Sequence, residues 1–324
     1  MRISLALVLM TALYGCGSSS GNGPPDGSTM TSDGGLPPPL HGFQIIGPTV
    51  EVAAGTEVTF CYYFRTPNAS DLAIKQWASR MTGGGHHMVV YFTRSDQQAP
   101  GTLSASKCGF YANGVGPVWT YAAVDSDHEA ALPADDGNGL PVAQIVKAGQ
   151  SGFIEMHFQN STDAVLRPHV ELNAYAYADG VQVTHAAPFV TYNTQIDLAP
   201  AVNAVTPTTG MVTGSCKVTS DAKFYLLSTH THKQGIHAYI RDGASTVFTA
   251  ASWDHPGERR WDSPPFQGFA TGSLGYQCDY SNPNSYRIED GDDMATDETC
   301  MAIGYYFPAA DDNGHLCVDS VMVY

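Results

Sequence analysis

Residues 57–64 read Glu-Val-Thr-Phe-Cys-Tyr-Tyr-Phe, a run of β-branched and aromatic residues that is typical of a β-strand. Similar runs return along the chain, separated by the turn-forming residues Gly, Pro, Asn and Asp. They lie at 43–46, 87–92, 152–158, 169–177, 223–228, 235–240 and 302–307. Many short strands at this spacing predict an all-β fold of antiparallel, jelly-roll-like β-sandwiches. Helical periodicity is scarce, and its best example is 71–80.

The composition narrows the class of protein. The chain has 324 residues with 15 Lys+Arg against 31 Asp+Glu, a net charge of −16, and this acidic balance excludes a nucleic-acid binder. A hydrophobic content of 43% allows a core large enough to offset chain entropy. The length suits two domains of roughly 140 residues or one large domain. Because 184–209 contains Pro and shows little strand pattern, we expect two tandem sandwiches at 41–183 and 184–324.

The N-terminus resembles a bacterial lipoprotein signal. An apolar run at 3–14 is too short to span a bilayer, and it ends in Leu-Tyr-Gly-Cys, similar to a lipobox with Cys16 as the lipidated residue. Ordinary signal cleavage nearby is the alternative. Residues 17–40 are mostly Gly, Ser, Pro, Thr and Asp and predict a disordered linker. We therefore expect a signal peptide at 1–16 and an exported protein with a lipid anchor to the membrane of a bacterial envelope, facing the periplasm or the cell surface; Gly17 favours the outer membrane.

Five of the twelve histidines lie in three contexts that suit metal binding. His230 and His232 are separated by one residue, so in a β-strand both side chains project from one face and can share an ion. His86 and His87 normally point to opposite faces, so both can bind one ion only at a strand end or a bulge. The glycines that precede them allow such a distortion. His157 stands in the apolar run 152–158.

Each context alone also has a simpler interpretation. A histidine in an apolar strand, such as His157, is often a hydrogen-bonded core residue, and a single His-x-His or His-His pair often arises by chance. Together, the three contexts favour a metal, and imidazole ligands suit copper or zinc. The sequence has no clustered oxygen ligands of the kind that Ca²⁺ and Mg²⁺ prefer. The other histidines stand singly and are interpreted as surface or structural residues: His41, His128, His169, His185, His237, His255 and His315.

The order and spacing of these contexts resemble the copper type II, ascorbate-dependent monooxygenases, the family of peptidylglycine α-hydroxylating monooxygenase and dopamine β-monooxygenase. The His-His-Met at 86–88 is similar to the family's motif, and His157 is similar to the third histidine of the same electron-transferring copper site. The His-Thr-His at 230–232 looks like the motif at the copper that binds O₂. The resemblance covers 41–324 and implies two copper sites on two β-sandwich domains.

The cysteines agree with this resemblance. It implies three disulfides, which pair Cys61 with Cys108, Cys216 with Cys317 and Cys278 with Cys300. Of the seven cysteines, only Cys16 is then left over, for the lipid. An even set of cysteines in an exported protein is itself typical of disulfides.

Two positions depart from the family's pattern. The stretch Asp-Glu-Thr-Cys at 297–300 resembles the family's Asp-Glu-Met-Cys, whose Met is a ligand of the oxygen-activating copper, but here the position is Thr299. A register shift would bring in the sulfur of Met301, and Met294 is a looser candidate; alternatively Met301 is a core residue and the second site has only two protein ligands. The second departure is Ser228, which stands where the peptide-amidating branch has an Arg that binds the substrate's carboxylate.

The resemblance implies a copper-dependent monooxygenase that hydroxylates a C–H bond of a small molecule with O₂ and a reductant, ascorbate or another donor. No catalytic residue is assigned beyond the copper ligands. Two alternatives stay open: a non-catalytic copper-binding lipoprotein on the same scaffold, because of Thr299, and a β-sandwich surface protein whose histidines bind no metal.

Overall fold

The computed structural model describes residues 34–105, 116–203, 205–291, 293–294, 296–310 and 314–323. The expected signal peptide and Cys16 lie outside these residues, so lipidation stays a prediction. In the described part of the chain, no helix is long and apolar enough to cross a membrane.

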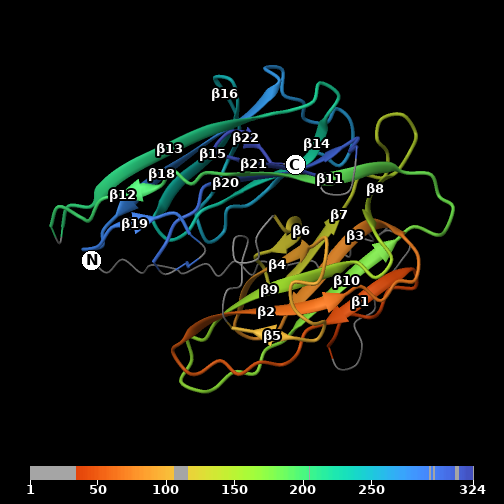
Figure 1. Ribbon diagram of the computed structural model, residues 1–324, viewed down its shortest axis with the longest axis horizontal. Helices are drawn as coiled ribbons and strands as arrows, with labels where there is room; N and C mark the ends of the chain where they lie inside the picture. The colour runs from red at the N-terminus through yellow and green to blue at the C-terminus, as the bar shows by residue number, and fades with distance from the viewer. Residues whose placement is uncertain are drawn as a thin grey trace, which may run out of the picture.

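The largest sheet has eleven strands and runs through both halves of the chain (Figure 1). Its order is β1-β10-β3-β8-β11-β20-β14-β17, with β7 beside β3, β21 beside β11 and β22 beside β21. The strands are β1 (Gly42–Ile46), β3 (Leu72–Met81), β7 (Asp127–Ala131), β8 (Val142–Val146), β10 (Val170–Ala176), β11 (Thr184–Tyr192), β14 (Lys223–His230), β17 (Arg259–Arg260), β20 (Met301–Phe307), β21 (His315–Val318) and β22 (Val321–Met322).

Three smaller sheets complete the fold. The first half adds β5 (Leu103–Ser104), β2 (Glu57–Arg65), β9 (Ser151–Gln159), β4 (Gly85–Phe92) and β6 (Val118–Ala123), in that spatial order. The second half adds β13 (Thr208–Lys217), β18 (Ser273–Asn282), β15 (Gly235–Asp242) and β16 (Ser245–Thr249), and the pair β12 (Asp197–Leu198) and β19 (Ile288–Glu289). One apolar core lies within the second half, and the other fills the first half and extends onto β11, β14 and β20 of the second. The predicted all-β sandwich architecture is confirmed.

The large sheet continues across the point where the sequence places a domain boundary. β11 begins at Thr184, pairs in parallel with β8 of the first half and pairs in antiparallel fashion with β20 of the second. The two sandwiches are therefore joined side by side through backbone hydrogen bonds, and the surfaces on either side of this joint face each other. Their division into independent domains stays a prediction.

The strand β3 occupies 72–81, where the sequence shows its best example of helical periodicity. β3 pairs with β10 on one side and with β8 and β7 on the other. A strand in this interior position forms hydrogen bonds with both neighbours, and this pairing overrides a weak local helical pattern. Ile74 and Trp77 of β3 are three residues apart, and both are almost fully buried. The burial of both side chains therefore explains the spacing of these apolar residues.

The last residues of the expected linker lie against the first sandwich. The backbone amide of Leu36 donates a hydrogen bond to Glu171 Oε2, and the side-chain amide of Asn173 donates one to the carbonyl of Pro37. The composition of 17–40 predicts disorder throughout. It contains no information about the partners on β10 that the last residues of this segment contact.

Phe224 tests the core of the second sandwich. Its side chain is fully buried, with ring centroids 5.4 Å from Phe189 and 5.1 Å from Phe269. We expect Phe224→Ala to lower the free energy of unfolding by about 3–5 kcal/mol, because it removes buried area and leaves a cavity. Denaturant titration measures the change. Tyr286→Ala is the control, because the side chain of Tyr286 is 45% exposed. A loss below about 1 kcal/mol would show that this core is wrongly described.

Candidate metal centre

Three of the predicted metal-binding histidines meet where β4 and β9 pair. His87 lies opposite His157, and the register shifts between Gly85 and His87. This irregularity lets the adjacent His86 join the other two side chains. The Nδ1 atoms of His86 and His157 each lie 3.2 Å from Nδ1 of His87, and one ligand atom from each of the three residues lies within 4.8 Å of the others.

Burial keeps this three-histidine group neutral. It lowers the pKa of His87 to about 3, with His86 adding to the shift, and lowers the pKa of His157 to about 3, with His87 adding to it. A metal ion binds imidazole in its neutral form. Three neutral nitrogens that converge on one point form a donor set suited to copper or zinc, so these residues fit the metal that the resemblance implies.

Glu57 orients the ring of His157. Its Oε1 lies 2.9 Å from His157 Nε2, which leaves Nδ1 directed at the other two histidines. The other oxygen of Glu57 lies 3.2 Å from the Lys233 ammonium, next to His232 in the second half of the chain. Sequence reasoning missed Glu57, since only the β2–β9 register, which pairs Thr59 with His157, brings it to the ring.

His230 and His232 form the second group. His230 ends β14, and the two ring centroids are 5.2 Å apart. Burial lowers the pKa of His230 well below its usual value and that of His232 to about 4. The His230 ring centroid lies only 6.3 Å from that of His87, so the two groups adjoin. Among the described residues, no third imidazole, thiolate or carboxylate joins this pair within the spacing of the first group.

Glu298 holds the turn that carries His232. Its carboxylate accepts hydrogen bonds from the backbone amides of His232, at 2.9 Å, and Gln234, at 2.6 Å. His232 Nδ1 lies 3.0 Å from the carbonyl of Asp297, which only accepts, so Nδ1 donates and Nε2 is left with its lone pair. Gly235 is needed here because a Cβ would lie 2.4 Å from Thr231 Oγ1. Glu298 belongs to the Asp-Glu-Thr-Cys stretch at 297–300, but no local sequence pattern predicts its contact with the His232 turn.

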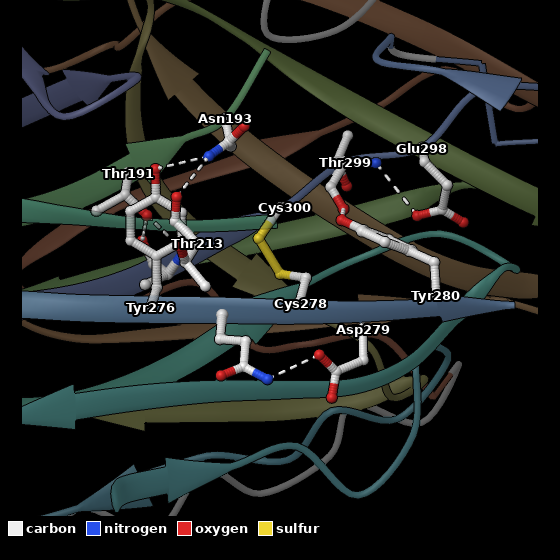
Figure 2. Close-up of a disulfide and its surroundings, with 12 residues drawn as sticks. Thr191, Asn193, Thr213, Tyr276, Cys278, Asp279, Tyr280, Glu298, Thr299 and Cys300 are labelled. Carbon is white, nitrogen blue, oxygen red and sulfur yellow. Dashed lines mark hydrogen bonds between the residues drawn. A yellow bond between two sulfur atoms is a disulfide. The ribbon is translucent and has the colours of Figure 1, made fainter. Parts of the chain in front are cut away.

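A disulfide fixes the segment that contains Glu298. Cys278 on β18 is bonded to Cys300, and the Tyr280 hydroxyl donates a hydrogen bond to the carbonyl of Thr299 at 2.8 Å (Figure 2). Figure 2 shows Glu298, Thr299 and Cys300 in succession above β18. The position of the His232 turn thus depends on a covalent bond between β18 and the start of β20.

Both cysteines of two of the three expected disulfides lie in the described residues. The pairs Cys278–Cys300 and Cys216–Cys317 are both present. Cys61 is fully buried on β2, and its expected partner Cys108 lies outside the described residues. The first pair of cysteines therefore stays a prediction.

Met301 lies beside the second group. It is the direct cross-strand partner of His230, is 2% exposed and lines the same cavity, so its thioether is on the face that carries the His230 ring. Thr299 also lines this cavity, and its buried hydroxyl has no hydrogen-bond partner among the described residues. Met294 lines the cavity as well. Met301 is thus both a core residue and a potential neighbour of a metal at His230.

A cavity of about 210 Å³ separates the two sandwiches beside these groups. Four of the five histidines line it, and His157 lies behind His87 with ring centroids 4.7 Å apart. Trp253 lies over His86, with centroids 6.3 Å apart and rings nearly parallel. His128, interpreted from the sequence as a surface or structural residue, is half-buried in the cavity wall. Ser228 donates a hydrogen bond to the carbonyl of Gly257.

Comparisons with known proteins add little. No protein-family model and no curated protein matches the chain. Among solved structures it is similar to one described as the triple jelly roll fold and turret assembly in an archaeal virus, at 9% identity, with 86% of this chain and 62% of that chain covered and a TM-score of 0.20.

Two further structures give the same picture. A tail fiber protein from an E. coli phage matches at 9% identity, with 85% and 39% of the two chains covered and a TM-score of 0.19. The VP2 subviral particle of infectious bursal disease virus matches at 10% identity, with 82% and 72% covered and a TM-score of 0.19. The chain spans less than two thirds of the first two. TM-scores this low carry no argument about this protein.

Glu57→Ala tests the orientation of His157. We expect the affinity of the three-histidine group for Cu(I) to fall by about 10–100-fold, because His157 loses the partner that fixes its ring. Competition with a chromophoric Cu(I) chelator measures this, in a background that carries His230→Ala and His232→Ala so that only one group reports. Glu51→Ala is the matched control, since Glu51 forms an exposed ion pair with Arg167. A change below twofold would rule out the role of Glu57.

Proposed function

We propose that the protein binds two copper ions and is a monooxygenase, which inserts one atom of O₂ into a C–H bond of a small molecule. The observation that carries this proposal is the gathering of five largely buried, neutral imidazoles around one cavity. The motifs at 86–88, 157 and 230–232 that resemble the copper type II monooxygenases are the ones that come together.

The three-histidine group would hold one ion. His87 and His157 are positioned by the β4–β9 ladder, and Glu57 leaves His157 Nδ1 directed at the shared point. Because burial keeps these rings neutral, no proton has to leave before they bind a cation at neutral pH. The five-stranded sheet gives the three nitrogens a rigid support.

His230 and His232 would hold the second ion. The Asp297 carbonyl and the Glu298 carboxylate set the orientation of His232, and Met301 offers a soft sulfur beside His230. Bound copper supplies one-electron transfer and the activation of O₂. The chain's own contribution is to place the two groups together, with His87 and His230 in adjoining positions, and to line the cavity with apolar walls that limit water.

The electron donor would come from outside the chain, as ascorbate or another small reductant. An exported protein with the lipid anchor expected at Cys16 would meet such a reductant in the cell envelope. The acidic surface, at a net charge of −16, would also attract Cu²⁺.

A second candidate is copper binding without catalysis. Thr299 stands where the family has a methionine ligand, and the second group offers only two imidazoles within the described residues. A hydroxyl does not replace a thioether in stabilising Cu(I). This candidate predicts loading with copper and no substrate-dependent use of O₂.

Oxygen consumption distinguishes the two candidates. We expect the copper-loaded protein to consume O₂ in the presence of ascorbate and a panel of small apolar molecules, and His230→Ala to abolish the substrate-dependent part. A Clark electrode with product analysis by mass spectrometry gives both readings. His237→Ala is the matched control, because His237 is exposed on β15 and does not line the cavity.

Two results would contradict the monooxygenase proposal. One is copper-loaded protein that forms no hydroxylated product with any member of the panel, which would favour the second candidate. The other is substrate-dependent oxygen consumption that survives in His230→Ala, which would place turnover elsewhere.

A further inference from the structure

The cavity wall contains a buried tyrosine whose hydroxyl has no hydrogen-bond partner among the described residues. Tyr225 is 3% exposed and lines the cavity, with its ring tilted against those of Tyr305 and Phe307 at centroid distances of 6.1 and 6.2 Å. No hydrogen bond of its hydroxyl is found among the described residues. A buried hydroxyl without a partner is unfavourable, so a group that enters the cavity and pairs with it gains affinity.

A second polar group in the wall is His128. Its Nδ1 lies 2.8 Å from the Tyr121 hydroxyl, which is in turn 2.9 Å from Ser79 Oγ. These contacts satisfy Tyr121 and fix the His128 ring, and they leave Nε2 as the ring atom without a partner in the described structure. His128 and Tyr121 come from the first half of the chain and Tyr225 from the second, so the cavity has polar groups on both sides.

These polar groups carry no net charge. Burial raises the pKa of Tyr225 and of Tyr121 above the ordinary value for tyrosine, and lowers the pKa of His128. Arg260, the cation in the wall, is occupied by Glu258, Asp262 and the carbonyl of Ala131. A ligand in this part of the cavity therefore meets hydrogen-bonding groups without a free ionic partner.

Carboxylates occur elsewhere around the cavity. Asp125 and Glu258 are exposed, and Asp254 is half-exposed, so solvent screens them. Glu155 lies near the three-histidine group, 3.9 Å from His87 Nε2, and burial raises its pKa to about 7. Exposed Glu258 and Asp125 act on His128, whereas the charged side chain that acts on the Tyr225 hydroxyl is Arg260 and no carboxylate of the described residues does so. A cationic ligand would therefore find no charge partner beside Tyr225.

Size and wall chemistry limit the ligand further. The cavity measures about 210 Å³, and an apolar cavity of about 150 Å³ is enough to hold benzene. Its sides include Leu226, Ile303 and the rings of Trp77 and Trp119. The Trp119 ring centroid lies 6.1 Å from that of His230, so an apolar ligand along this wall reaches the second histidine group.

We propose that the cavity binds an uncharged, largely apolar molecule of about the size of a substituted benzene, whose single hydroxyl or carbonyl group pairs with the Tyr225 hydroxyl and His128 Nε2. This ligand directs the rest of its skeleton toward His230. The claim that this ligand is the hydroxylated substrate rests on the proposed function. The claim that the cavity binds such a ligand does not depend on it.

Binding to the metal-free protein tests this assignment independently of copper. The probes are 4-ethylphenol, ethylbenzene, phenethylammonium and phenylacetate, which share one ring and differ in polar group or charge. Quenching of tryptophan fluorescence reports occupancy, since Trp77 and Trp119 line the cavity. We expect 4-ethylphenol to bind at least about tenfold more tightly than either charged probe.

Tyr225→Phe locates the polar contact. It is expected to weaken 4-ethylphenol binding by about three- to tenfold, which corresponds to the loss of one hydrogen bond, and to leave ethylbenzene binding unchanged. Tyr286→Phe, on an exposed tyrosine outside the cavity, is the matched control and should change neither. The thermal unfolding midpoint of each variant verifies that it is folded.

Several results would overturn the proposal. These are phenethylammonium or phenylacetate binding as tightly as 4-ethylphenol, Tyr225→Phe leaving 4-ethylphenol binding unchanged, and Tyr225→Phe weakening ethylbenzene equally. A protein that binds 4-ethylphenol as expected but no copper would support the cavity's specificity and end the proposed function. A protein that binds copper but prefers a charged probe would end the proposed specificity of the cavity and leave the proposed copper binding in place.

Discussion

The antiparallel pairing of β4 with β9 is the interaction on which the candidate metal centre depends. This ladder places His87 opposite His157, and a slip of one strand by one residue would turn one of the two side chains to the other face of the sheet. The shift between Gly85 and His87 adds His86 to the same group. In the second half, the pairing of β14 with β20 has the corresponding effect, because it sets Met301 opposite His230. Backbone hydrogen bonds thus determine which side chains meet.

Contacts between the two sandwiches connect the histidine groups. Glu57 joins His157 in the first half to Lys233 in the second, where Lys233 follows His232 directly. The large sheet holds the two halves together through β8 and β11, and residues of both halves line the cavity. Glu57 thus forms a charge contact between the two segments that carry the histidine groups. That connection suits chemistry in which two metal ions cooperate.

Much of the fold was predictable because it is local in the sequence. Runs such as 57–64 and 223–228 carry their strand character in their own residues, and they form β2 and β14. The stretch 71–80 shows a weak helical period, because its strand state comes from neighbours on both sides, which the local pattern does not contain. The grouping of His230 with His232 was predictable from their spacing, since one intervening residue in a strand places two side chains on one face.

The supporting residues were not predictable, because their roles depend on long-range register. Glu57 reaches His157 from a strand about one hundred residues earlier, and Glu298 reaches the His232 turn from a segment 66 residues later in the chain. The sequence predicts a surface or structural role for His128, and the structure has it on β7 beside the Tyr121 hydroxyl. A carboxylate or a single histidine gives no periodic signal, so only the assembled sheets reveal these contacts.

Copper stoichiometry tests the central claim most directly. The chain is loaded with copper, freed of excess metal and measured by elemental analysis together with His157→Ala and His230→Ala. Two ions per chain in the wild type and one in each variant are the predicted result. Less than about 0.2 copper per chain in the wild type, or equal loading of all three proteins, would contradict the assignment of two copper sites to these histidines.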